Sequence, residues 1–205
     1  MKIISIGCNC DVGFFIKNNF NSEYYPFDWL WSNIDFVINT FEKDYFEFTE
    51  CEKLNAVWVS SNMHTYIFNN NCKGYNERIC TAVSVHDADC MSQIQYNSNI
   101  PLINDKYTRR FKRLYNILNQ EEDIILIRKV LDKTQGAVKK DLDTHEKINY
   151  LSELLLKKFK RKITICIVDN EGYINKNNTL NNIKVFNSFE DLLLFINGYS
   201  KYLNV

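Results

Sequence analysis

Two cysteines one residue apart, Cys8 and Cys10, follow a short apolar run near the start of the chain. A thiol at this point would lie where the backbone N–H groups of a following helix converge, and a helix N-terminus lowers a thiol pKa toward the reactive range. A thiolate is a nucleophile without a metal, and the same N–H groups can accept the oxyanion of acyl transfer. The pair therefore indicates nucleophilic chemistry at Cys10, although a buried, unreactive thiol in a tight turn would have the same spacing.

A cysteine nucleophile needs an imidazole as its base, and the chain has three histidines. His145 falls in the first turn of a predicted amphipathic helix, where a solvated side chain is expected, and His64 lies at the start of a predicted strand. His86 follows an apolar run, at a strand end where catalytic residues of α/β folds gather. We therefore predict His86 as the base, with Asp28 or Asp87 orienting its ring.

The choice between the two aspartates stays open. Asp87 is adjacent to His86, and neighbouring strand residues point to opposite faces, so it orients the ring only if the strand has ended. Asp28 lies among aromatic residues and must be paired if it is buried. Its other interpretation is a loop aspartate that caps a turn or pairs with an arginine such as Arg128. The residues predicted to contact substrate are Asn9, Trp29, Arg109 and Arg128.

Two other functions, a zinc site and a non-catalytic binding module, are alternatives to catalysis. Cys8, Cys10, His86 and Cys90 are four ligands of types that zinc accepts, but Cys-x-Cys is less typical than Cys-x-x-Cys. The run from Arg109 to Arg113 has four basic residues, which could bind a phosphate, a nucleotide sugar, nucleic acid or a protein, or form a solvated helix face. Gly7 lacks the further glycines of a dinucleotide fingerprint, so no cofactor is expected.

The elements that must position these residues alternate along the chain. The first strand (2–7) turns into a helix (11–19) capped by Asn9 or Cys10, and an aromatic loop (24–32) leads to a second helix capped by Ser32. A loop is expected after Cys90, through Pro101. Tyr107, Phe111, Leu114 and Leu118 then form a helical stripe, and Asp143 to Glu146 have the spacing of a capping box. The predicted later helices are 33–46, 144–159 and 189–199, and the predicted later strands are 56–60, 64–68, 81–85, 123–128, 163–168 and 183–186.

This alternation predicts one α/β domain over residues 1–205, with a mixed, mainly parallel sheet, helices on both faces and a less regular middle region at about 47–105. Lys plus Arg and Asp plus Glu are 25 each, so no net field would attract nucleic acid, which is not an expected partner. The chain has no apolar stretch long enough for a membrane span or a signal peptide. We expect a soluble cytoplasmic protein, with its seven cysteines mostly reduced.

Several motifs resemble a known family. They are Ser5-Ile6-Gly7-Cys8-Asn9-Cys10, Tyr25-Pro26-Phe27-Asp28-Trp29, His86-Asp87, Tyr107-Thr108-Arg109-Arg110-Phe111 and a buried strand ending in Arg128. Together they resemble the putative papain-like cysteine peptidases, a family of unknown function found in bacteria and large DNA viruses, over residues 1 to about 170. The abundance of Asn, Lys and Ile also fits an AT-rich viral or low-GC microbial genome, and for a viral source the expected location is the host cytoplasm. The resemblance implies Cys10 as nucleophile, His86 as base and a peptide or other acyl substrate, and the chain departs from the family pattern at Cys8.

Overall fold

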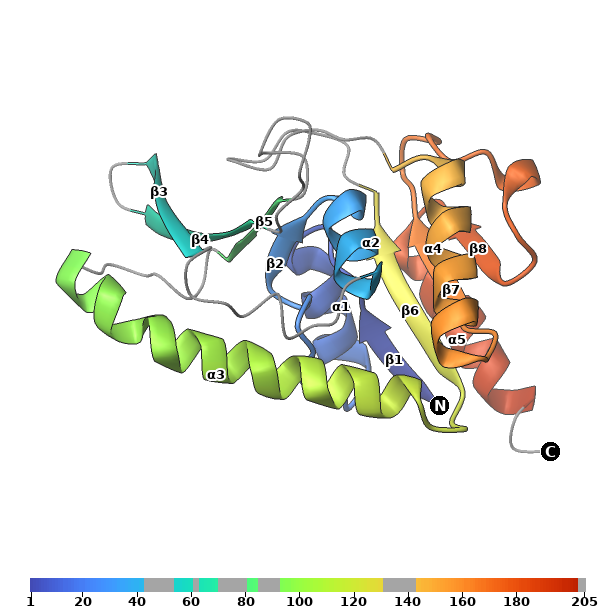
Figure 1. The fold of residues 1–205 in the computed structure, drawn as a ribbon. Helices are drawn as coiled ribbons and strands as arrows, with labels where there is room; N and C mark the ends of the chain where they lie inside the picture. The colour runs from blue at the N-terminus through green and yellow to red at the C-terminus, as the bar shows by residue number, and fades with distance from the viewer. Residues whose placement is uncertain (43–53, 61–62, 70–80, 85–92, 131–142, 203–205) are drawn as a thin grey trace.

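The structure, a computed structural model, describes residues 1–42, 54–60, 63–69, 81–84, 93–130 and 143–202 (Figure 1). The described residues form α-helices, strands and one short 3-10 helix, η3. In chain order these elements are β1 (Lys2–Ser5), α1 (Cys10–Asn19), β2 (Leu30–Ser32), α2 (Ile34–Glu42), β3 (Leu54–Ser60), β4 (Met63–Asn69), β5 (Thr81–Ser84), α3 (Gln93–Leu118), β6 (Ile124–Lys129), α4 (His145–Phe159), β7 (Thr164–Val168), η3 (Lys176–Asn178), β8 (Ile183–Phe186) and α5 (Phe189–Tyr202).

The centre of the fold is a four-stranded parallel sheet in the order β1-β6-β7-β8. Its strands are runs of isoleucine, leucine and valine rather than alternating patterns, because helices cover both faces. On one face Ile4 and Leu126 pack against α2, α3 and α4, and on the other Ile3 and Ile125 pack against α1 and α5. The predicted α/β class with a parallel sheet and helices on both faces is confirmed.

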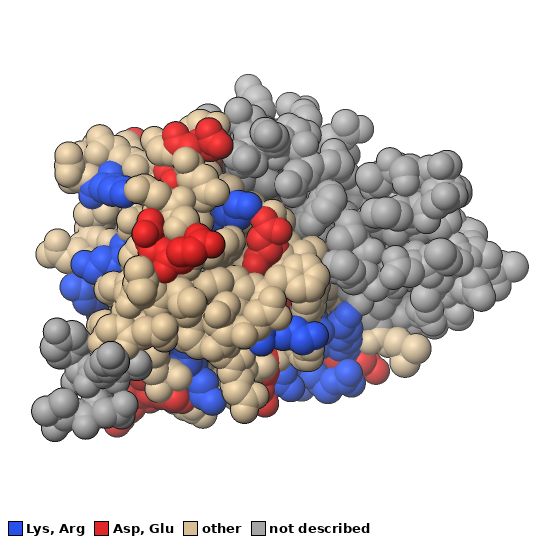
Figure 2. Space-filling view, turned by 180° about the vertical axis from the view of Figure 1, so that it is seen from behind, with Lys and Arg blue, Asp and Glu red and all other residues tan. Residues whose placement is uncertain are grey.

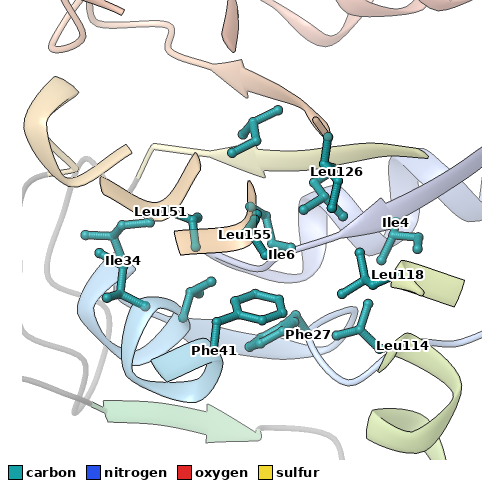
Figure 3. Packing of buried hydrophobic residues seen from close by; sticks show 14 of the residues in the cluster. Ile4, Ile6, Phe27, Ile34, Phe41, Leu114, Leu118, Leu126, Leu151 and Leu155 are labelled. Carbon is teal, nitrogen blue, oxygen red and sulfur yellow. The ribbon is translucent and has the colours of Figure 1, made fainter. Parts of the chain in front are cut away.

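The larger core lies between the sheet and the face formed by α2, α3 and α4. Figure 3 shows side chains from these three helices, from β1 and β6, and from the loop before β2 pointing toward one another. Phe27 is fully buried there and packs edge-on against Phe111 at 5.8 Å between ring centroids. Thus the aromatic segment that follows α1, residues 24–32, is anchored in the core.

The strands of the middle region pair with one another in a separate antiparallel sheet, in the order β2-β5-β4-β3. Figure 1 shows this sheet beside the parallel one, with α3 running beneath both. β3 and β4 form the predicted hairpin. β2 was expected to be loop, and it is a strand because its three residues complete the edge of this sheet beside β5.

Three further local predictions were wrong. The loop expected up to Pro101 is helical, since α3 begins at Gln93 and continues through the proline; the lost backbone donor is a local cost that the remainder of a 26-residue helix outweighs. Asn33 rather than Ser32 caps α2, with its Oδ1 accepting from the N–H of Phe36 at 2.9 Å. Thr144 rather than Asp143 caps α4, because the Asp143 carboxylate has another partner, described below.

Candidate active site

The turn that joins β1 to α1 has an unusual backbone. Gly7 and Cys8 both have positive φ angles, of 87° and 94°, and Asn9 then returns to an extended conformation as the N-cap of α1. A positive φ is cheap for glycine and costs about 1–3 kcal/mol for other residues, so Cys8 holds a strained conformation. Cys10 follows as the first residue of the helix. The strand-to-helix turn predicted from the sequence is confirmed.

Ser32 holds this turn in place from the edge of the second sheet. Its N–H donates to the carbonyl of Cys8 at 2.9 Å, and its Oγ accepts from the N–H of Cys8 at 3.4 Å. A Cβ on Gly7 would lie 2.2 Å from the Ser32 Oγ, so only glycine fits here. The turn is therefore fixed by β2 and by steric exclusion, in addition to the helix that follows.

The two cysteines of the turn have different environments. Cys8 is 1% exposed, and burial raises the pKa of its thiol to about 12. Cys10 is half-buried at the N-terminus of α1. A neutral thiol under the turn is a poor nucleophile, whereas a thiol at a helix N-terminus is in a place that favours the thiolate.

A buried ion pair lies beneath the turn. Arg128 is fully buried, and its Nε and Nη2 donate to the two carboxylate oxygens of Asp143 at 2.7 and 3.0 Å. Burial acts to lower the pKa of Arg128, but the charge and hydrogen bonds of Asp143 outweigh it, and the pKa is raised. Nη1 and Nη2 also donate to the carbonyls of Ile6 and Ser32, both at 3.1 Å. These contacts favour an internal role for Arg128 rather than contact with substrate, and its partner is Asp143 rather than Asp28.

The predicted orienter Asp28 is buried behind α1. Its Oδ2 accepts from the N–H of Tyr25 at 2.6 Å, so it closes the turn of the aromatic segment. Burial raises its pKa to about 7, although the nearby charges of Arg110 and Arg113 act in the opposite direction. A Cβ on Gly13 of α1 would lie 2.2 Å from the carbonyl oxygen of Asp28. The aromatic segment therefore packs directly on the helix that carries Cys10.

Polar residues form the other side of the Cys10 helix end. The Oδ1 of Asn9 accepts from the N–H of Asp11 at 3.1 Å, and the Asp11 carboxylate pairs with Lys129 at 2.6 Å. Burial acts to raise the pKa of Asp11, but the hydrogen bonds from Lys129 and Asn9 lower it. Asn9 thus acts as the cap, and the β6 end is tied to the first turn of α1.

A cavity of about 50 Å³ lies next to Lys129 at the carboxyl ends of β6 and β7. This volume accommodates a few water molecules rather than a side chain. Its lining residues are Lys129, Val130, Val168, Asp169, Asn170, Glu171 and Tyr173. We therefore assign no substrate group to it.

The structure describes only some of the remaining predicted site residues. Trp29 is half-buried and contacts Phe14 of α1, and Arg109 is exposed on α3. His86 and Asp87 lie outside the described residues, so their distances from Cys10 remain predictions. His145 opens α4 and pairs with Glu146 at 2.8 Å.

The zinc hypothesis stays untested for a similar reason, because His86 and Cys90 are outside the described residues. Within the described ranges, no three His, Cys, Asp or Glu side chains cluster as metal ligands. No described helix is long and apolar enough to cross a membrane.

Sequence reasoning missed three residues that shape the site, namely Gly13, Ser32 and Asp143. Their contacts join segments distant in sequence, so local spacing did not reveal them. The arginine at the end of an apolar strand was the available clue, since a buried guanidinium requires a carboxylate.

Comparison with known proteins agrees with the motifs of the turn. No curated protein and no solved structure matches the chain. Residues 1–168 match a family described as putative papain-like cysteine peptidase (DUF1796). This range includes both cysteines of the turn, the aromatic segment and all strands of the parallel sheet except β8. The chain belongs to this family of putative papain-like cysteine peptidases.

Proposed function

We propose that the protein is a cysteine hydrolase or acyltransferase that acts on a peptide or related acyl substrate, with Cys10 as nucleophile, His86 as base and Asp28 or Asp87 as orienter. The observation that carries the proposal is the position of Cys10, a half-buried thiol on the first residue of α1 after a strained turn. Membership of the family of putative papain-like cysteine peptidases supports a cysteine nucleophile.

The proposed reaction has two steps. The Cys10 sulfur, deprotonated by His86, attacks the acyl carbon, and the oxyanion that forms faces the N–H groups of the first turn of α1. The protonated His86 gives its proton to the leaving group as the carbon–nitrogen or carbon–oxygen bond breaks. Water or another acceptor then attacks the thioester, with His86 taking its proton, and Cys10 is released.

The buried ion pair would contribute by keeping the turn rigid. Arg128 joins Ile6, before the turn, to Ser32, which binds the turn from the side. A nucleophile must stay within a fraction of an ångström of its attack position, so a rigid support is valuable. We assign Arg128 and Asp143 this supporting role, without contact to substrate.

The test measures the alkylation rate of Cys10 by iodoacetamide near neutral pH, with the site identified by mass spectrometry. We expect Cys10 to react much faster than the buried Cys166, and His86→Ala to slow it about tenfold or more. His145→Ala is the matched histidine control and should leave the rate unchanged.

A second experiment measures hydrolysis of a mixture of peptides and activated esters by the protein. Cys10→Ser should abolish hydrolysis and the covalent acyl adduct on the enzyme. If Cys10 reacts like a simple thiol in both the wild type and His86→Ala, or if hydrolysis survives Cys10→Ser, the proposal fails.

A further inference from the structure

Three aromatic side chains form a ridge on the surface next to Cys10. The rings of Phe14 and Trp29 meet edge-on at 5.0 Å between centroids, and Trp29 lies 6.2 Å from Tyr24. Phe14 is 49% exposed and Tyr24 is 43% exposed, although large aromatic side chains are mostly buried in a chain of this size. Trp29 between them is half-buried, and a group of rings that reaches the surface in this way indicates a contact surface.

The ridge begins one helical turn from the proposed nucleophile. Cys10 and Phe14 are four residues apart on α1, so they lie on the same face of the helix with their Cβ atoms about 5–6 Å apart. The ridge is therefore within reach of the residues that flank a scissile bond held at Cys10.

The other end of the ridge is basic. The guanidinium of Arg110 lies 5.6 Å from the ring centroid of Tyr24, and Arg113 donates to the Tyr24 carbonyl at 2.7 Å. Arg109 and Lys112 of the same helix are exposed. Figure 2 shows several Lys and Arg side chains, with some Asp and Glu among them, at the lower edge of the molecule, where Figure 1 places α3.

The charges of this basic end are only partly neutralised. Arg113 pairs with Glu23 at 3.6 Å, and that pair is largely exposed. Nη1 of Arg110 is buried and has no hydrogen-bond partner among the described residues, so Arg110 contributes to this end through its charge and its contact with Tyr24. Arg109, Arg110, Lys112 and Arg113 outnumber the acidic residues near them, which are Asp105, Glu23 and Asp28, so the end of the ridge keeps a net positive charge.

We propose that this aromatic–basic strip (Phe14, Trp29, Tyr24, Arg109, Arg110, Lys112) is a substrate subsite, and that the substrate is a peptide with an aromatic side chain near the reacting bond and acidic side chains beyond it. The inference rests on the proposed function for the position of the reacting bond. Rings select an aromatic side chain by edge and face contacts, and a basic end selects carboxylates.

The spacing within the peptide follows from the strip. The centroid distances of 6.2 Å from Trp29 to Tyr24 and 5.6 Å from Tyr24 to Arg110 each equal about two residues of extended peptide at about 3.3 Å per residue. The first acidic side chain is therefore expected about two to four residues from the aromatic one.

The test uses two fluorescein-labelled peptides that share one phenylalanine and differ in having glutamates or lysines after it. Binding to Cys10→Ser is followed by fluorescence anisotropy, so that no peptide is consumed. We expect the acidic peptide to bind about tenfold or more tightly than the basic one, and its affinity to fall with added salt.

Two variants test whether the preference for the acidic peptide depends on the strip. Arg109→Glu with Lys112→Glu should remove the preference for the acidic peptide, and Phe14→Ala should weaken both peptides. Lys157→Glu with Lys162→Glu introduces the same charge change at exposed positions outside the strip and should leave the preference intact. Urea unfolding of each variant checks that it is folded.

The two proposals fail in different ways. Equal affinity for the two peptides, or a preference that survives Arg109→Glu with Lys112→Glu, overturns the subsite even if Cys10 is reactive. An unreactive Cys10 together with a strip-dependent preference overturns the enzyme proposal and leaves a peptide-binding surface.

Discussion

Removing the charge of Asp143 should be among the most damaging changes to this protein. Arg128 and Asp143 are both 0% exposed and form two hydrogen bonds, at 2.7 and 3.0 Å. In Asp143→Asn the amide keeps nearly the same size, but the guanidinium becomes a buried charge without a counter-charge. Breaking one side of such a pair costs about 3–5 kcal/mol. This is a large part of the total of about 5–15 kcal/mol expected for a domain.

Urea unfolding, followed by far-UV circular dichroism, measures the effect. With a dependence on urea of about 2–3 kcal/mol per molar, the midpoint should fall by about 1–2.5 M. The matched control is Asp35→Asn, which breaks the pair with Lys147 at 2.8 Å. Both members of that pair are more than a fifth exposed, so this change should cost only about 0–1 kcal/mol.

A double variant separates the charge from the loss of packing. Arg128→Met with Asp143→Leu removes both charges and should recover more than half of the stability lost in Asp143→Asn. Recovery will be incomplete because the carbonyls of Ile6 and Ser32 lose their donors. If Asp143→Asn costs no more than Asp35→Asn, or if the double variant is as unstable as Asp143→Asn, the ion pair does not stabilise the turn as argued.

Three further predictions concern the surroundings of the turn. Gly13→Ala forces a Cβ against the Asp28 carbonyl and should lower the free energy of unfolding by about 1–3 kcal/mol, whereas Gly198→Ala, with open space around it, should raise it by about 0.5–1 kcal/mol; similar midpoints in urea would contradict the close contact. Burial raises the pKa of Asp28 to about 7 in the folded protein, so the folded state favours the neutral carboxyl. The contribution of Asp28 to the free energy of unfolding is therefore fully present below the unfolded pKa of about 4 and is lost as the pH rises to about 7, by on the order of 4 kcal/mol in all. Asp28→Asn should therefore flatten the curve of unfolding free energy against pH over this range, and an unchanged slope would refute the assignment. Cys8→Ala should keep the iodoacetamide reactivity of the turn and Cys10→Ala should abolish it, while the reverse result would make Cys8 the nucleophile.

Much of the fold was readable from local patterns. The stripe of Tyr107, Phe111 and Leu114 is buried as predicted, since periodic apolar residues must face a core whatever its other members are. The turn after β1 was also predictable, because glycine, a capping asparagine and a helix-period pattern follow one another directly. The structure of these elements is determined by residues that are close together in the sequence.

Other features depend on contacts between distant segments. Asp143 has the spacing of a helix cap, but its carboxylate is used by Arg128, fifteen residues earlier, and Thr144 takes the cap. β2 is a strand only because β5 lies beside it. For the catalytic pair, Cys10 and His86, the assignment stays a prediction, because His86 lies outside the described residues.

The site can be understood from the difference between its two cysteines. The chain turns from β1 into α1 through two successive residues with positive φ, and the second of them, Cys8, is buried, with its N–H bonded to Ser32 and its thiol near the charge of Arg128. Its buried thiol stays protonated, so it can fill space but not attack. The same turn places Cys10 on the first residue of the helix, next to the exposed ring of Phe14. Cys8 is thus part of the support of the turn, and under the proposed function Cys10 is the thiol that this turn presents for reaction.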